Sequence, residues 1–367
     1  MKKTLAALAV LTAFAGTAAA AEVTLYGKVD LGLNYQNTDV NGTDTSTFQQ
    51  KSGQFAGSRF GLKGTEDLGN GLKVGFVLEN GFTPDDGNLA QGGRLFGRQA
   101  TVYVNGGFGE IAFGRVGSLT SGLGSYSFIY NYAPFSTGWG DTAGAQTLFD
   151  LSDRDRFDNT VTYVTPSFAG LKVYAQYSFS TSGQEAAGNE RNNKRYAGIG
   201  ANYEAGAFSA GIVVDTILNN HLATNTTNQE DSLGISVGAA YDFGVLKLHG
   251  FAQYGASENK FGDFTTSVGT EGVDGYTLTL GVIAPVAGGT LYAQASYADA
   301  ENAQSVAGTA DQEFDRVGGA IGYSYNLSKR TTVYGFGAYS EGTVEQTGAA
   351  DTKTKNTEVG FGILHNF

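Results

Sequence analysis

The sequence contains no cysteine, one methionine and only four prolines in 367 residues. The absence of cysteine fits an oxidising compartment, although cysteine-free cytosolic proteins also exist. Beyond the N-terminus no segment has 18 consecutive apolar residues, so no transmembrane helix is predicted. The formal net charge is −12 and no basic stripe appears, which argues against a nucleic-acid partner. The acidic residues cluster in predicted loops, as a solvated surface would.

Glycine and aromatic residues are abundant instead. The chain has 55 glycines, 20 tyrosines and 24 phenylalanines, and only 16% of its residues are charged. This composition is typical of many short strands. The strands of a membrane barrel need no continuous apolar run, because only alternate residues contact lipid.

The N-terminus has the pattern of a secretory signal peptide. Lys2 and Lys3 form a basic region, residues 4–14 are mostly apolar, and three alanines follow at 18–20. We predict a signal peptide over residues 1–20, with cleavage near Ala20 or Ala21, and a single domain over residues 21–367.

Residues 23–36 show the clearest strand pattern. Odd positions from Val23 to Tyr35 are apolar or glycine, whereas most even positions are polar, among them Lys28 and Asp30. A period of two with one apolar face predicts a half-buried strand. The run is longer than the soluble average of about 5–6 residues. Similar alternation recurs at 72–78, 171–179 and 232–243, where the polar face is rich in glycine and serine, and we interpret that face as a wet lumen.

The connections between these strands alternate between short and long. Seven short turns and eight long loops join sixteen predicted strands; the short turns lie at 66–71, 105–109, 166–170, 204–206, 242–244, 285–289 and 326–329. An even strand number with short turns on one side indicates an outer-membrane barrel, and closure leaves no free edge in lipid. The last predicted strand ends at Phe367 and is expected to pair with the first strand to close the barrel. We therefore predict an all-β, sixteen-stranded antiparallel transmembrane barrel, wide enough for an aqueous channel.

One long segment, residues 118–155, lacks strand alternation and contains Trp139, the only tryptophan. A structureless segment of that length is expected to have a function. We predict that it folds into the barrel mouth as a constriction loop. Trp139 is then either an anchor of this loop or a pore-lining residue.

Motifs for catalysis are weak. Residues 234–238 (GISVG) match the nucleophile pattern of hydrolases, but they lie within a predicted strand and not at a strand-to-helix turn. The three histidines are far apart, so no metal site is predicted. We expect neither an enzyme nor a cofactor.

The chain resembles the general porins of the Gram-negative outer membrane, in particular the beta-proteobacterial branch. The resemblance spans Val23 to Phe367 and is carried by 23–27 (VTLYG), 58–69 (SRFGLKGTEDLG), 98–100 (RQA), 113–115 (FGR), 159–170 (NTVTYVTPSFAG) and 364–367 (LHNF). It implies a sixteen-stranded homotrimer for passive diffusion of small hydrophilic solutes. It also implies contacts with outer-membrane lipid and lipopolysaccharide, and a terminal Phe367 that signals to the assembly machinery.

The resemblance further implies an arginine ladder that faces the third loop. The matching positions are Arg59, Arg98 and Arg156. Alternation places Arg59 on the lumen side, whereas Arg98 shares parity with apolar residues and its assignment rests on the resemblance. The alternative is that each arginine only pairs with a loop acid for structure. Other expected constriction residues are Lys28, Lys63, Arg115, Asp141 and Asp150.

The third loop lacks the acidic motif of enterobacterial porins, since residues 133–136 read APFS. We therefore expect a net positive, mildly anion-preferring constriction, because side-chain charges in a narrow pore set ion preference. A substrate-specific channel with an aromatic path (Tyr26, Tyr126, Tyr130, Tyr132) remains an alternative. A barrel adhesin is a further one.

Overall fold

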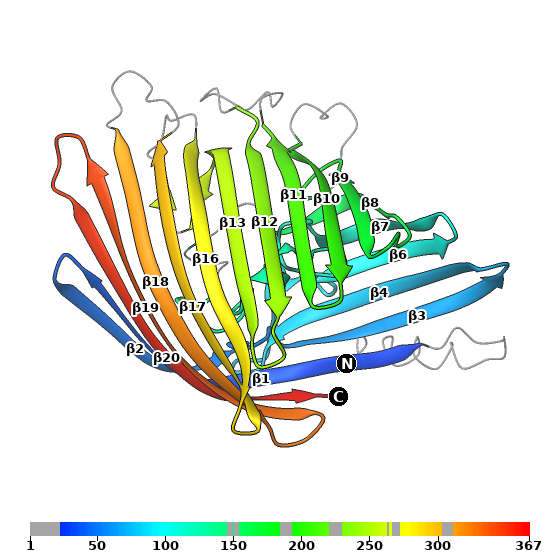
Figure 1. Cartoon of the computed structure of the whole chain (residues 1–367), viewed down its shortest axis with the longest axis horizontal. Helices are drawn as coiled ribbons and strands as arrows, with labels where there is room; N and C mark the ends of the chain where they lie inside the picture. The colour runs from blue at the N-terminus through cyan, green and yellow to red at the C-terminus, as the bar shows by residue number, and fades with distance from the viewer. Residues whose placement is uncertain are drawn as a thin grey trace, which may run out of the picture.

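The computed structural model describes residues 23–144, 149, 154–183, 193–219, 230–262, 264–265, 272–302 and 311–367. The predicted signal peptide and Asp150 lie outside these residues. Within them, sixteen antiparallel strands pair into a closed ring (Figure 1). In ring order these strands are β1 (Thr24–Val40), β3 (Arg59–Gly69), β4 (Leu72–Thr83), β6 (Gln99–Gly106), β7 (Gly109–Gly117), β8 (Arg156–Val164), β9 (Leu171–Ser178), β10 (Arg195–Ala205), β11 (Phe208–Leu218), β12 (Leu233–Asp242), β13 (Lys247–Glu258), β16 (Val273–Val286), β17 (Gly289–Asn302), β18 (Gln312–Asn326), β19 (Thr331–Gln346) and β20 (Thr352–Asn366).

Closure of the ring depends on β1. Its residues Lys28–Val40 pair with β20, and its first residues, Thr24–Lys28, pair with β3. The final residue completes the seam: Phe367 N–H donates to the Gly27 carbonyl at 3.0 Å, and Gly27 N–H donates back at 3.1 Å. The prediction that the C-terminal strand pairs with the first strand is confirmed.

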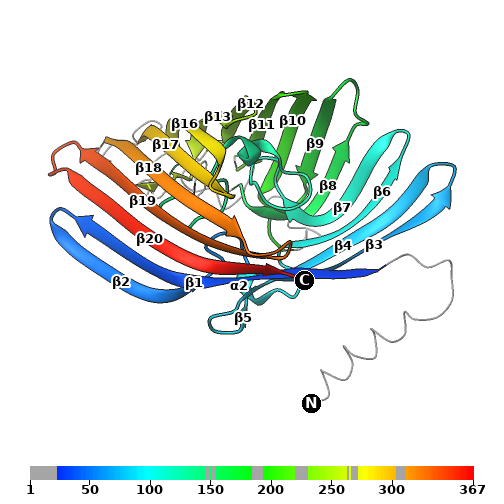
Figure 2. The same cartoon turned by 60° about the horizontal axis from the view of Figure 1, so that its bottom comes forward.

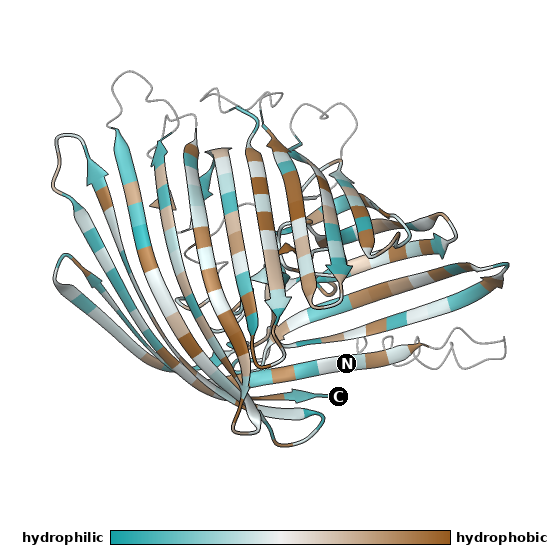
Figure 3. Cartoon of the chain, in the orientation of Figure 1, coloured by the Kyte–Doolittle hydropathy of each residue, from teal (hydrophilic) through white to brown (hydrophobic). Residues whose placement is uncertain are grey.

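Alternation along most strands separates an outward apolar face from an inward, more polar face. On β1, the outward residues Leu33 and Tyr35 are 36% and 40% exposed, whereas the inward Asp30 and Asn34 are fully buried. Figure 3 shows the same alternation of hydrophobic and hydrophilic bands along most strands. The described part of the chain contains no helix that is both long and apolar enough to cross a membrane.

The seven predicted short turns are confirmed as connections between neighbouring strands. Four of them contain only two residues, and in two of these four both residues have positive φ: Asn70 (53°) with Gly71 (77°), and Ala287 (49°) with Gly288 (80°). A two-residue hairpin turn with φ positive at both positions matches the right-handed strand twist.

Some predicted loops contain regular structure. The first, at 37–54, is largely an extension of β1 that pairs with β2 (Thr43–Ser52). The second contains β5 (Asn88–Leu89) and the one-turn helix α2 (Ala90–Gly93), and β14 (Lys260–Phe261) pairs with β15 (Phe264–Thr265). Strand pairing continues into these segments because it gives their backbone N–H and C=O groups regular hydrogen-bond partners.

The buried hydrophobic residues lie inside the ring. The chain after β7, including the short 3₁₀ helix η1 (Ile129–Tyr132), lies within the ring of strands in Figure 2. Three of the four buried clusters join residues of this segment to inward side chains of the wall. The candidate functional site therefore lies on the inner face of the barrel.

Candidate functional site

The segment 118–144, which we call the inner loop, leaves β7 and packs first against β9–β13. Phe128 packs on Tyr174 of β9 with ring centroids 4.7 Å apart, and Tyr130 packs on Phe251 of β13 at 5.1 Å. The Tyr132 hydroxyl donates to the Asn202 Oδ1 of β10 at 2.6 Å. These contacts hold η1 against one half of the inner wall.

Glycines of the wall form the seat for the inner loop. A Cβ added at Gly238 on β12 would lie 2.5 Å from Tyr132, and one at Gly211 on β11 would lie 2.9 Å from both Phe128 and Tyr132. Further along, a Cβ at Gly281 on β16 would lie 2.6 Å from Pro134. Real Cβ atoms essentially never approach other atoms closer than 3.0 Å. The sequence pattern predicts that inward glycines line a wet lumen, but at these positions they make room for a second layer of chain.

Trp139 is the centre of the next contact. Its ring packs against Phe55 (4.5 Å), Tyr292 (4.9 Å) and Phe135 (5.3 Å), and against Tyr334 and Phe336 of β19 at 6.0 and 6.1 Å. The residue is only 3% exposed. Trp139 is therefore an anchor of the inner loop. The inward aromatic residues of β19, Tyr334 and Phe336, therefore face protein and not water.

Glu358 of β20 holds the far end of the inner loop. Its Oε2 accepts from the backbone N–H groups of Asp141 (2.9 Å) and Thr142 (2.6 Å), while its Oε1 accepts from Asn34 Nδ2 at 2.7 Å. Lys51 of β2 lies 2.7 Å from an Asp141 carboxylate oxygen and 3.4 Å from Glu358. The charge of Asp141, an expected constriction residue, is thus countered by Lys51.

Arg154 fixes the return of the chain to the wall. Its Nε donates to Asp215 of β11 at 2.9 Å, an Nη pairs with Glu258 of β13, and all three side chains are at most 1% exposed. The Tyr196 hydroxyl also donates to Asp215 at 3.1 Å. Sequence reasoning missed the roles of Arg154 and Glu358, because no local pattern indicates a partner so distant in the chain.

A buried hydrogen bond also holds Tyr126 of the inner loop against the wall. The Tyr126 hydroxyl donates to Glu110 of β7 at 2.8 Å. Burial, followed by the nearby Glu110 carboxylate, raises the pKa of Tyr126 well above its usual value, so the phenol stays neutral and remains a donor. The loop is held by hydrogen bonds as well as by apolar packing.

Two of the predicted arginines converge opposite the inner loop. Arg98 Nε donates to Glu79 Oε1 at 2.7 Å, and an Nη of Arg59 lies 3.7 Å from the same oxygen. A Cβ added at Gly57 would lie 3.0 Å from an Arg98 Nη and 3.9 Å from an Arg59 Nη, so both guanidinium groups meet there. Strand β6 begins at Gln99, after Arg98, and for this reason strand parity does not govern the direction of Arg98.

The other predicted cations are distributed differently. Lys28 lies opposite Arg59 in the β1–β3 pairing and so shares its face. Lys63 lies four residues after Arg59 on β3, about 13 Å along the strand. Its ammonium group lies over the Tyr26 ring. Arg156 is buried where the loop returns, 3.4 Å from Asp155. Arg115 belongs to another cluster, in which it and Arg94 each lie 2.7 Å from the same Asp158 oxygen.

A cavity of about 410 Å³ separates the two arginines from the inner loop. Arg59, Arg98 and Gly57 border it on one side, and residues 134–139 with Phe55 and Tyr292 on the other. Glu79 is the one acid paired with these arginines in the described residues, and no local sequence pattern distinguishes it from other polar strand residues.

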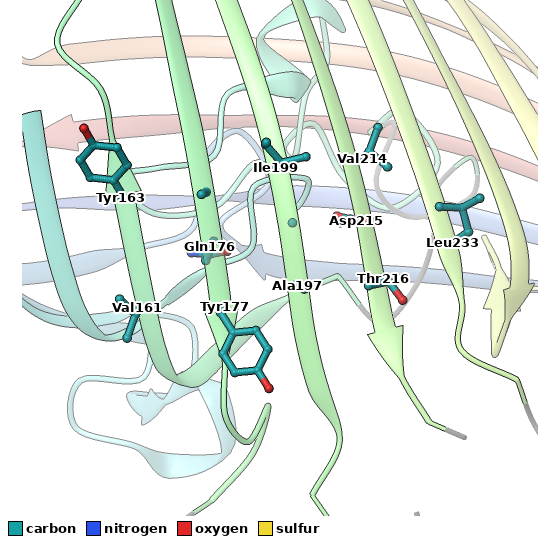
Figure 4. Close-up of a pocket in the computed structure, with 12 residues that line it drawn as sticks. Val161, Tyr163, Gln176, Tyr177, Ala197, Ile199, Val214, Asp215, Thr216 and Leu233 are labelled. Carbon is teal, nitrogen blue, oxygen red and sulfur yellow. The ribbon is translucent and has the colours of Figure 1, made fainter. Parts of the chain in front are cut away.

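A second cavity, of about 520 Å³, lies on the outer face of β8–β12 (Figure 4). Its lining is mostly apolar and includes Tyr163, Tyr177, Ile199 and Leu233. Asp215 also borders it but points inward to Arg154. This groove is part of the outward apolar band. Among the described residues no cluster of three or more His, Cys, Asp or Glu side chains could hold a metal ion.

Comparisons with known proteins agree with this architecture. Residues 7–345 match a family model described as Gram-negative porin. The chain is 33% identical over its full length to a full-length outer membrane porin protein of Bordetella pertussis, and 34% identical, again over both full lengths, to outer membrane porin protein 32 of Delftia acidovorans. Among solved structures, an anion-selective porin from Comamonas acidovorans superposes with a TM-score of 0.70 at 31% identity, covering 95% of this chain and 100% of that one.

Family and fold together indicate an outer-membrane channel for passive diffusion rather than an enzyme. The chain belongs to the Gram-negative porin family.

Proposed function

We propose that the cavity between Arg59, Arg98 and the inner loop is the narrowest part of a diffusion channel for small hydrophilic solutes. The observation that carries this proposal is the convergence of two guanidinium groups at Gly57, opposite a loop segment fixed at both ends. Solutes that enter the barrel must pass between the two, because the inner loop packs against the wall on the other side.

The charges favour anions in this passage. Arg59 and Arg98 together carry two positive charges against the single negative charge of Glu79, and Lys28 adds another cation on the same face. Arginine keeps its charge next to other cations. Support also comes from the Comamonas acidovorans neighbour, which is described as anion-selective.

The assembly we propose is a homotrimer in the outer membrane, exported by means of the predicted signal peptide, which is then cleaved. One Vibrio cholerae outer membrane protein of the same fold is described as a trimer form. The outer surface of β6 and β7 exposes Val102 and Phe113, each 47%, and we assign this wall to subunit contact. Lipid and lipopolysaccharide surround the remaining apolar band, and Phe367 at the closing seam serves as the signal to the assembly machinery.

The tyrosine path considered for a substrate-specific channel is not supported. Tyr126, Tyr130 and Tyr132 are at most 5% exposed because they pack against the wall. They hold the loop and offer no surface to a solute. No described feature favours a barrel adhesin or a catalytic site.

The test is the reversal potential of the refolded chain in a planar bilayer under a KCl gradient. We expect stepwise conductance with chloride preference. One charge about 4 Å from a passing ion contributes about 1 kcal/mol even in water, so Arg59→Ala or Arg98→Ala should lower the chloride-to-potassium permeability ratio severalfold. Lys63→Ala, an exposed lumen cation about 13 Å away along β3, is the matched control and should change it little.

Two results would contradict the proposal. A chain that folds but shows no conductance steps is not a diffusion channel. Potassium preference, or equal effects of Arg59→Ala and Lys63→Ala, would mean that charges outside the cavity determine the selectivity.

A further inference from the structure

The cavity has an aromatic wall as well as a cationic one. Phe55 and Tyr292 border it and are only partly buried, so their rings reach the open space. Trp139 and Phe135 also border the cavity and pack against these rings, with the Trp139 centroid 4.5 Å from Phe55 and 4.9 Å from Tyr292, and the Phe135 centroid 6.3 Å from Tyr292. A small inorganic ion uses none of these rings.

The inner-loop part of the aromatic wall is held in a strained backbone conformation. Ser136 and Trp139 have positive φ values of 44° and 71°, although neither is glycine. Both Trp139 and Gly140 N–H groups donate to the Gln54 carbonyl, and a Cβ at Gly138 would lie 2.2 Å from the Phe55 carbonyl oxygen. Left-handed conformations of non-glycine residues are unfavourable and are concentrated at functional sites. The rings are therefore fixed in place before any solute arrives.

The opposite wall supplies donors for a carboxylate. Guanidinium groups bind carboxylates through paired N–H donors. The Arg59 Nε is already engaged with the Gly57 carbonyl at 2.8 Å and the Arg98 Nε with Glu79 at 2.7 Å, which fixes how both groups are oriented. The cavity thus has cationic donors on one side and ring faces on the other.

We propose that this cavity prefers anions with a flat aromatic body, namely monocyclic arene carboxylates, over other solutes of the channel. The inference rests on the proposed function and adds its solute class. The carboxylate binds at Arg59 and Arg98 while the ring stacks on Tyr292 or Phe55. A volume of about 410 Å³ is at the small end of ligand pockets, roughly 300–1,000 Å³, which suits a single ring.

Three small molecules distinguish the contribution of the carboxylate to binding from that of the aromatic ring. Benzoate has both, acetate has only the carboxylate, and benzyl alcohol has only the ring. Each is added at the same concentration to the conducting channel in KCl, and its affinity is taken from the reduction in ion current. Benzoate should reduce the current at lower concentration than acetate, and benzyl alcohol should have the weakest effect.

Trp139 provides a second readout that needs no variant. It is the only tryptophan of the chain and lies in the cavity wall. Benzoate should therefore change its fluorescence in the refolded protein, and acetate should not. Equal responses to the two would overturn the inference.

The aromatic wall is tested with Tyr292→Leu, which keeps apolar bulk but removes the ring. Benzoate affinity should fall about two- to tenfold, the range expected for one aromatic pair, while chloride preference is retained. Tyr292→Phe should restore it. Tyr297→Leu is the matched control, since Tyr297 lies on the same strand but is 37% exposed on the outer face.

The outcomes distinguish the two proposals. If the channel conducts with chloride preference but binds benzoate no better than acetate, the solute class is wrong and the diffusion channel stands. If Tyr292→Leu and Tyr297→Leu behave alike, the ring does not bind in this cavity. A folded protein without conductance would remove both proposals.

Discussion

The inner wall of this barrel has two halves that differ in the size of their inward side chains. On β1, β3 and β4 the inward side chains include Tyr26, Arg59 and Glu79, which are large, polar and joined to one another. On β11, β12 and β16 the inward positions under the inner loop include Gly211, Gly238 and Gly281, which leave no room for a side chain. Both halves alternate with a period of two, yet one faces the open cavity and the other faces protein.

The difference shows that an inward glycine has two meanings in a barrel. Where the wall borders water, a small residue widens the lumen. Where a second layer lies on the wall, glycine permits backbone contact that no other residue allows, as at Gly238 below Tyr132. We call the part of the wall that the inner loop covers the layered half, and the part that carries Arg59 and Arg98 the cationic half. The layered half behaves as a protein core, which tolerates added volume poorly.

The strongest way to break the layered half is to remove its buried cation. Arg154→Met leaves Asp215 and Glu258 in place with their charges uncompensated, which typically costs about 3–5 kcal/mol. We expect a loss of that size in urea unfolding of the refolded protein, followed by Trp139 fluorescence. Arg94→Met, which removes a 43% exposed partner of Asp158, should cost less than about 1 kcal/mol. Equal losses in the two variants would mean that Arg154 does not anchor the chain.

Overpacking the glycine seat should have the next largest effect. In Gly238→Val the new side chain meets Tyr132 within 2.5 Å, and overpacking of this kind costs about 1–3 kcal/mol. The displaced η1 should also increase the noise of single-channel current. Gly337→Val, where a Cβ meets nothing within 4 Å, is the control and should leave both stability and noise unchanged. A quiet, stable Gly238→Val channel would show that η1 does not rest on this seat.

Much of the fold follows from local patterns in the sequence. Alternation predicts the strands and their faces, turn residues predict the short connections, and the terminal Phe367 predicts the closing pair with β1. Arg59 also follows from parity, because β3 is regular around it. These features depend on residues that are neighbours in the chain or in a hairpin, or that lie at its ends.

The layered half could not be predicted in the same way. Periodicity tells which side chains point inward, but it contains no information about what lies on them. The path of the inner loop is fixed by contacts such as Arg154 with Asp215, 61 residues apart, and Thr142 with Glu358, 216 apart. Arg98 shows the same limit on a small scale, since parity fails one residue before a strand begins.

Removing the charge of Glu79 should increase the anion preference of the cationic half. Glu79→Gln keeps the size of the side chain but takes away the charge between Arg59 and Arg98. We expect chloride preference to increase by a factor of about five, the value of one charge worth about 1 kcal/mol near a passing ion. Glu66→Gln, at the exposed turn end of β3, should have no such effect. Unchanged selectivity in Glu79→Gln would mean that permeating ions do not pass these arginines.

The smallest effect is expected where the two halves meet, at the Lys51 contact with Asp141 and Glu358. The Lys51 side chain is 18% exposed and that of Asp141 53%, so Lys51→Ala should cost no more than about 1 kcal/mol. Glu358→Ala removes the acceptor of two backbone N–H groups and should cost more, about 1–3 kcal/mol for the buried Thr142 donor left unsatisfied. Unfolding midpoints of the two variants compare them directly. If Lys51→Ala proved the more damaging, the loop tip would be held by charge attraction, and not by the backbone hydrogen bonds that hold a core.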